Sequence, residues 1–236
     1  MKNLLVIAAL LLCAYWARPA KAWTEGQTLD VSAVTAVVIA GEASSLHLST
    51  ASDTPYLATM KGWRKGWLSF WYSSWSSDEC RSGGTMRVEG STLHVETGSS
   101  SWFGPSDCGF EIRINLHKGA AISIDQAAVQ TQMTGDYTSI ALASHAGDIS
   151  LDGHATNVDV KGNAMRVRLD FETINQNETI TIEAKALDAY VGFADKTPIS
   201  YSVAGTASYV DSTLANTPGA KPSIGIKGDF VHATIS

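Results

Sequence analysis

The sequence predicts an all-β protein, and more narrowly a single-stranded β-solenoid similar to a parallel β-helix. Three observations support this fold class. Apolar and polar residues alternate along many short segments, these segments recur at a nearly constant step, and glycine and aspartate stand between them. Only 17% of the residues are charged, and no apolar stripe at helical spacing follows the first 22 residues. Together these features favour strands and tight turns over helices.

The alternation identifies the strands themselves. In each segment every second residue is apolar, which places the apolar side chains on one face of a strand and the polar ones on the other. The clearest segments are Ile122–Ile124, Ile149–Leu151, Val158–Val160, Val167–Phe171, Ile180–Ile182, Tyr201–Val203 and Ile224–Ile226.

The step between strands distinguishes a coil from a sandwich. Strand centres near residues 123, 132, 141, 150, 159 and 168 are about nine residues apart, which indicates one strand and one turn, repeated. The expected corners are glycines at or beside strand ends, at Gly135, Gly147, Gly153, Gly162 and Gly228. A β-sandwich remains the alternative, but its hairpins favour Asn-Gly or Asp-Gly turns, and only one such dipeptide occurs.

The N-terminus has the features of a cleavable signal peptide. One lysine precedes an apolar run over residues 4–12, and small residues at 20 and 22 place the cleavage site before Trp23. We therefore expect a signal peptide over 1–22 and a single domain over 23–236. An uncut membrane anchor would need a longer apolar run, and a lipid attached at Cys13 would need a small residue before it rather than Leu12.

The charge balance excludes some partners. Without the signal, 14 basic residues face 23 acidic ones, a net charge of −9. Such a surface disfavours binding to nucleic acid or anionic lipid. No second long apolar run follows, so we expect no integral membrane span and a soluble or peripheral protein, with a monomer as the default because its charge opposes stacking.

Two cysteines remain after the signal, Cys80 and Cys108. In an oxidising compartment we expect them to form a disulfide, worth roughly 3 kcal/mol for a loop of about 28 residues. The alternative, a metal-binding or catalytic thiol pair, lacks a Cys-x-x-Cys spacing and a nearby histidine.

A tryptophan-rich insert of about 61–108 interrupts the pattern. Its tryptophans are candidates for a binding surface, because flat indole rings stack on sugar rings and favour interfaces. Arg64 and Lys65 could add contacts to an acidic sugar or a lipid headgroup. The alternative is a cap over the end of the solenoid, whose core and edges need cover. The five residues are Trp63, Trp67, Trp71, Trp75 and Trp102.

No catalytic motif is present, and no cofactor is expected. His145 and His154, nine residues apart with Asp148 and Asp152 between them, are weak candidates for a metal site. Some β-helices are polysaccharide lyases or hydrolases, which use clustered carboxylates. Here the acids are spread along successive strands, at Asp125, Asp148, Asp152, Asp159 and Asp170.

The segment from Gly119 to Gly162 resembles the secreted bacterial "putative adhesin" families, which are domains of unknown function with a β-solenoid fold. The residues that carry the resemblance are Ala121–Ile124, Ala146–Leu151 and Asn157–Val160. It extends over residues 110–236, is weaker over 29–60, and fails in the insert. It implies an exported bacterial protein, periplasmic or released, with no family catalytic residues to transfer.

The leading functional hypothesis is therefore an exported, noncatalytic envelope protein. It would act as an adhesin-like binder or structural scaffold that contacts a glycan, lipid or protein of the envelope. The alternative is a carbohydrate-active enzyme, a polysaccharide lyase or hydrolase built on a β-helix.

Overall fold

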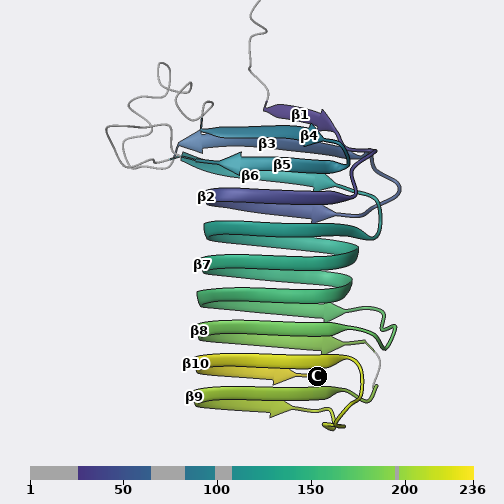
Figure 1. Cartoon of the computed structure of the whole chain (residues 1–236), viewed down its shortest axis with the longest axis vertical. Coiled ribbons are helices and arrows are strands. Elements are labelled where there is room, and N and C mark those ends of the chain that lie inside the picture. The colour runs from purple at the N-terminus through teal and green to yellow at the C-terminus, as the bar shows by residue number, and fades with distance from the viewer. Residues whose placement is uncertain (1–25, 65–82, 99–107, 195–196) are drawn as a thin grey trace, which may run out of the picture.

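The computed structural model describes residues 26–64, 83–98, 108–194 and 197–236, and among these no helix occurs. The described chain forms ten strands in one mixed sheet (Figure 1). The strands are β1 (Gln27–Asp30), β2 (Ala36–Ser49), β3 (Leu57–Arg64), β4 (Gly84–Glu89), β5 (Thr92–Thr97), β6 (Cys108–Asn115), β7 (Ala120–Phe171), β8 (Thr179–Phe193), β9 (Ser200–Ser212) and β10 (Ser223–Ile235). The prediction of an all-β protein is confirmed.

The sheet has a parallel body and an antiparallel end. Strands β2, β7, β8, β10 and β9 follow one another with parallel pairing, and β5 and β6 pair in parallel with the two halves of β2. Beyond them β1, β3 and β4 pair antiparallel with their neighbours. Two strands that lie within the segment 61–108, β4 and β5, thus belong to the sheet, since β5 lies directly beside β2.

The 52-residue strand β7 explains the regular step in the sequence. Figure 1 shows its ribbon turning back and forth on itself several times. Hydrogen bonds from Thr138 to Gly119, Ser144 to Ala127 and Ser150 to Thr131 join residues 17 to 19 apart in sequence. Each full turn therefore holds two strand segments, and the step of about nine residues is half a turn.

The core lies between the two strand segments of each turn. Alternate side chains point inward, and those of neighbouring strands stack in register, as Val37 does on Ile122 and Ile180 on Ile224. Burial of such side chains stabilises a protein by roughly 1.5–3 kcal/mol each. One such row is Val37, Ile122, Val158, Ile180 and Ile224, all buried.

A buried polar network replaces apolar packing at one corner of the body. Gln126, with 2% of its surface exposed, accepts a hydrogen bond from the Ser44 hydroxyl at 2.7 Å. Its amide nitrogen donates to the Thr97 hydroxyl at 2.9 Å. Ser44 lies in β2, which pairs with β7, and Thr97 lies in β5 on the other side of β2, so the Gln126 side chain connects three strands.

We expect the substitution Gln126→Ala to lower the free energy of unfolding by about 1–3 kcal/mol, because it leaves the buried Ser44 and Thr97 hydroxyls without their partner. Urea denaturation followed by circular dichroism measures the change. The control is Gln132→Ala on the exposed face of the same strand, which should cost little. Equal midpoints for the two variants would contradict the role of the network.

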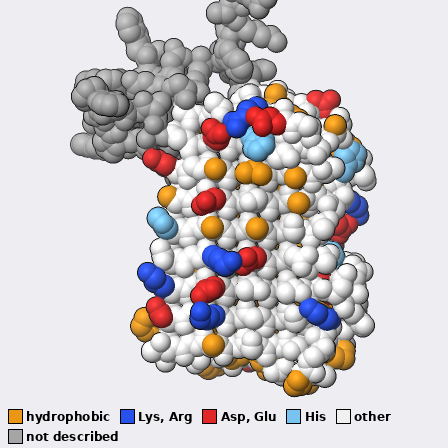
Figure 2. Space-filling view, viewed as in Figure 1, with side chains coloured by type: hydrophobic (Ala, Val, Ile, Leu, Met, Phe, Trp, Pro, Cys, Tyr) orange, Lys and Arg blue, Asp and Glu red, His pale blue; other side chains and the backbone are white. Residues whose placement is uncertain are grey.

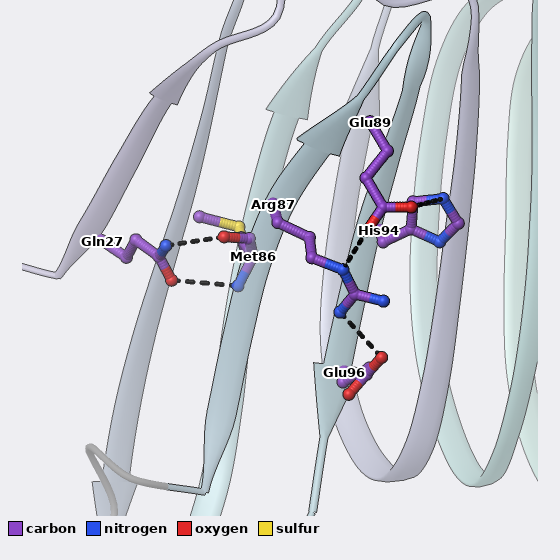
Figure 3. Close-up of polar contacts among 6 residues, drawn as sticks. All are labelled: Gln27, Met86, Arg87, Glu89, His94 and Glu96. Atoms are coloured by element: carbon purple, nitrogen blue, oxygen red, sulfur yellow. Dashed lines mark hydrogen bonds and ion pairs between the residues drawn. The ribbon is translucent and has the colours of Figure 1, made fainter.

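A side-chain amide bonds to the backbone of a strand edge at each end of the sheet. At the β1 end, the Gln27 amide donates to the Met86 carbonyl at 2.8 Å and accepts from the Met86 N–H at 3.0 Å (Figure 3). At the other end β9 is the last strand, because β10 lies between β8 and β9. Here Asn216 makes the same double contact with the N–H and carbonyl of Tyr201. Side-chain amides thus take the place of a further strand at one position of each end.

Candidate binding surfaces

The two segments that carry the tryptophans are attached to one end of the sheet. Arg64 at the end of β3 pairs with Cys108 at the start of β6, and the Gly98 N–H donates to the Gly83 carbonyl at 2.6 Å. The attachment point of residues 65–82 at Arg64 thus lies beside that of residues 99–107 at Cys108, and their other attachment points, Gly83 and Gly98, also lie side by side. Trp63 belongs to β3, while Trp67, Trp71, Trp75, Trp102 and Cys80 lie outside the described residues, as do the side chains of Trp63 and Cys108. The tryptophan binding surface and the Cys80–Cys108 disulfide therefore stay predictions.

A charged cluster lies on this same end of the sheet (Figure 3). Arg87 on β4 contacts Glu89 at 2.6 Å and Glu96 on β5 at 2.8 Å, and His94 lies 3.7 Å from Glu89. Hydrogen bonding to Arg87 lowers the pKa of the Glu89 carboxyl below its ordinary value. All four side chains are partly exposed. Such ion pairs contribute little to the free energy of folding, and the cluster mainly keeps this end of the sheet hydrated.

The most enclosed ionisable pair among the described residues is His154 with Glu178. His154 is 7% exposed and Glu178 is fully buried, and the His154 Nε2 lies 3.1 Å from Glu178 Oε1. The same carboxylate accepts the backbone N–H of Asn175 at 2.5 Å and of Asn177 at 3.1 Å. The contact with the carboxylate, which only accepts, requires a hydrogen on Nε2, whereas the Asn175 side-chain amide nitrogen, which only donates, also lies 3.2 Å from this Nε2.

Glu178 is ionised because of these donors. Burial acts to raise the pKa of Glu178, but the hydrogen bonds from the Asn175, Asn177 and Glu178 backbone and from His154 outweigh it, so the pKa lies below its ordinary value of 4.5. Every donor comes from the loop after β7 or from His154. The pair therefore anchors that loop against the corner and presents no free acid or base to solvent.

His145 does not share this corner. Nine residues are half a turn, and the His145 side chain is exposed while His154 is buried against Glu178. Asp148 and Asp152 are exposed as well. In the described ranges no three His, Cys, Asp or Glu side chains lie close enough together to hold a metal ion.

A row of charged side chains crosses the outer face of the body, and we call it the charged row. It runs over successive strand segments from Asp148 through Arg166 and Asp188 to His232. Arg166 lies 3.8 Å from each aspartate, and Asp188 lies 2.9 Å from the His232 Nδ1. The His232 ring stacks on Tyr209 of β9, with ring centroids 5.6 Å apart.

Two further carboxylates of the outer face pair with basic neighbours. Asp159 contacts Lys161 and Asp170 contacts Arg168, each at 2.8 Å, and both aspartates are half-buried, with the Oδ1 of Asp159 buried and without a hydrogen-bond partner among the described residues. Figure 2 shows positive and negative side chains interspersed on the face in view.

Sequence reasoning missed an exposed aromatic patch at the β9 end. Tyr209 on β9 is 64% exposed and Phe230 on β10 is 66% exposed. They border a shallow hollow whose floor includes Ala186, Leu187 and Ala207. One signal was present in the sequence. Phe230 pairs with Ala186 and Ala207, so it occupies a position where its neighbours carry alanine.

The described part of the chain includes no helix with the length and apolarity that crossing a bilayer requires. No family model matches the sequence, and no curated protein matches it either.

A search of solved structures finds matches at low sequence identity. A putative cell adhesion protein from Clostridium sporogenes is 10% identical, with a TM-score of 0.45, over 89% of this chain and 98% of that one. A putative adhesin from Bacteroides fragilis is 12% identical, with a TM-score of 0.30, over 89% and 94%. A putative adhesin from Parabacteroides distasonis is 12% identical, with a TM-score of 0.34, over 88% and 95%.

Proposed function

We propose that this chain is an exported, noncatalytic, adhesin-like protein whose sheet is a β-solenoid that displays a tryptophan-rich binding surface at one end. The observation that carries the proposal is the attachment of residues 65–82 and 99–107 at adjacent positions on β3, β4, β5 and β6. A rigid scaffold that presents loops at one end is a common arrangement for binding.

The solenoid assignment rests on the parallel body and the two-segment turn. Hydrogen bonds between residues 17 to 19 apart indicate one repeated turn, and β2, β7, β8, β10 and β9 pair in parallel. Signal cleavage before Trp23 would bring the protein to the periplasm or the exterior. There Cys80 and Cys108 would pair and hold the two tryptophan-bearing segments together.

The ligand class follows from the residue types in the insert. Trp63, Trp67, Trp71, Trp75 and Trp102 offer flat apolar faces with a polar N–H edge, which suits sugar rings and interfacial contacts. A noncatalytic role fits the described side chains, since the enclosed His154–Glu178 pair anchors a loop, and Asp159 and Asp170 form ion pairs with Lys161 and Arg168.

We expect the double substitution Trp67→Ala and Trp71→Ala to weaken binding by about tenfold or more, because each indole supplies stacking area. Tryptophan fluorescence during titration with soluble envelope glycans and with lipid vesicles measures binding. The control is Thr181→Ala on the exposed face of β8, which should leave binding unchanged. Lost stability with binding intact would instead assign the tryptophans to a cap.

An enzyme assay tests the alternative directly. Incubation with envelope and plant polysaccharides should release no product. Product release that Asp148→Asn or Asp159→Asn abolishes would overturn the noncatalytic assignment in favour of a carbohydrate-active enzyme.

A further inference from the structure

The exposed edge of β9 differs from ordinary sheet edges in its sequence. Its 13 residues include one charged side chain, Asp211, and no lysine, arginine or proline. Natural proteins usually protect such an edge with charges or proline, because its free N–H and carbonyl groups can pair with another chain. Among the described residues β9 pairs only with β10, apart from a single bridge between Ile199 and Asn216.

Apolar core is exposed beyond the second half of β9. Val210 pairs in register with Ala233, which is fully buried, so Val210 points inward. It is nevertheless 38% exposed, because no described strand lies beyond it. Together with Tyr209 and Phe230, this side chain leaves an apolar surface next to an unpaired strand edge.

The backbone at the start of β9 already has hydrogen-bond partners, and these limit which chain can pair with this edge. Asn216 occupies the N–H and carbonyl of Tyr201, and the Thr217 N–H donates to the Ile199 carbonyl at 2.8 Å. Residues 213–217 therefore project beyond β9 and form a raised corner at this end of the sheet. The other corner, between the two halves of β9, consists of the small residues Gly205, Thr206 and Ala207.

We propose that a second copy of this chain covers this end, in a closed two-fold dimer with the two β9 strands antiparallel. A two-fold axis through the end reverses the strand direction, so each raised corner of residues 213–217 faces the small Gly205–Ala207 corner of the other copy. The same exposed edge is present on both copies, so one contact satisfies both at once.

Charge is compatible with this pairing. If residues 207–211 pair antiparallel with themselves, Asp211 lies opposite Ala207 of the second copy, Val210 opposite Ser208 and Tyr209 opposite Tyr209, so that opposed side chains point to the same side of the sheet. The single charge on β9 thus does not face the same charge of the second copy, and two aromatic side chains meet across the contact.

The other end of the sheet cannot pair with the β9 edge of a second copy. There Gln27 occupies the N–H and carbonyl of Met86, and Arg87, Glu89 and Glu96 carry charge. A head-to-tail contact would bury these charges against an apolar edge, which is costly. The contact therefore closes as a dimer and does not extend into a filament.

The dimer is independent of the proposed ligand surface, because it uses the opposite end of the sheet (Figure 1). It would point the two β3–β6 ends away from each other. Such a particle presents two binding surfaces in opposite directions, and it gains avidity where both can engage.

Sedimentation velocity of the purified protein over a wide concentration series tests the proposal, and we expect reversible conversion from monomer to dimer. Val210→Lys should weaken dimerisation by about tenfold or more, because it introduces like charges at the contact. Phe230→Ser, which changes an exposed side chain, should weaken it while leaving the melting temperature close to that of the parent. Thr181→Lys, on the exposed face of β8, is the matched control and should not change the dimer.

Hydrogen exchange locates the contact. Amides of residues 207–212 should become protected as concentration rises, whereas those of β4 should not change. A protein that is monomeric at all concentrations would overturn the proposal and leave this edge to a different partner. A dimer that Val210→Lys and Phe230→Ser leave intact would overturn it as well.

Discussion

Replacing Gly153 with alanine is expected to lower the free energy of unfolding by about 3 kcal/mol or more. Gly153 has a φ of 142°, which side-chain-bearing residues rarely adopt. A Cβ atom there would lie 2.2 Å from the carbonyl oxygen of Gly135, one turn earlier in the chain. Because that neighbour is backbone in the adjacent turn, the clash cannot be relieved by a side-chain rotation.

Thermal unfolding followed by far-ultraviolet circular dichroism measures this effect. The matched control is Gly225→Ala in β10, where φ is not positive and the nearest atom to an added Cβ is the Ile180 carbonyl oxygen at 4.0 Å. The control should melt close to the parent protein. If both variants melt together, the corner does not require glycine at position 153.

Replacing Glu178 with alanine is expected to cost about 3 kcal/mol, because the backbone N–H groups of Asn175 and Asn177 and the His154 ring lose their shared acceptor in a buried corner. Glu178→Gln should cost less than alanine but still destabilise, since its amide nitrogen would face donors. Urea denaturation at neutral pH measures both. The control Glu172→Gln changes an exposed carboxylate nearby and should have little effect.

The same carboxylate predicts an acid dependence. The pKa of Glu178 in the folded protein lies below its ordinary value of 4.5, so its contribution to stability is complete above that value. That contribution is lost as the pH falls through the lowered pKa. Melting temperatures of the parent should therefore decline more steeply in this acidic range than those of Glu178→Gln. Parallel curves would show that Glu178 is not the group responsible.

Local pattern in the sequence predicted much of the body of the protein. Alternation in segments such as Val158–Val160 reflects one buried and one exposed face, and the structure buries Val158 and Val160 as expected. The step of about nine residues reflects a fixed strand and turn length, and it reappears as half a turn. Of the expected corner glycines, Gly135 and Gly153 adopt positive φ.

The candidate sites were less predictable, because they join residues that are distant in sequence. Nothing local to His154 identifies Glu178, 24 residues later, as its partner. The step is irregular after residue 171, so spacing alone cannot show which side chains face one another there. The predicted tryptophan surface lies outside the described residues, apart from Trp63 in β3.

The sequence by itself determined the all-β class and the half-turn repeat, because both follow from periodicities that each short segment carries. Only the tertiary structure decided the order of the strands at the two ends. The last strand in the chain, β10, lies between β8 and β9, so β9 and not the C-terminal strand forms the exposed edge. That choice depends on which strand offers the better register and buried area to β8, and those are properties of pairs of distant segments that no single segment encodes.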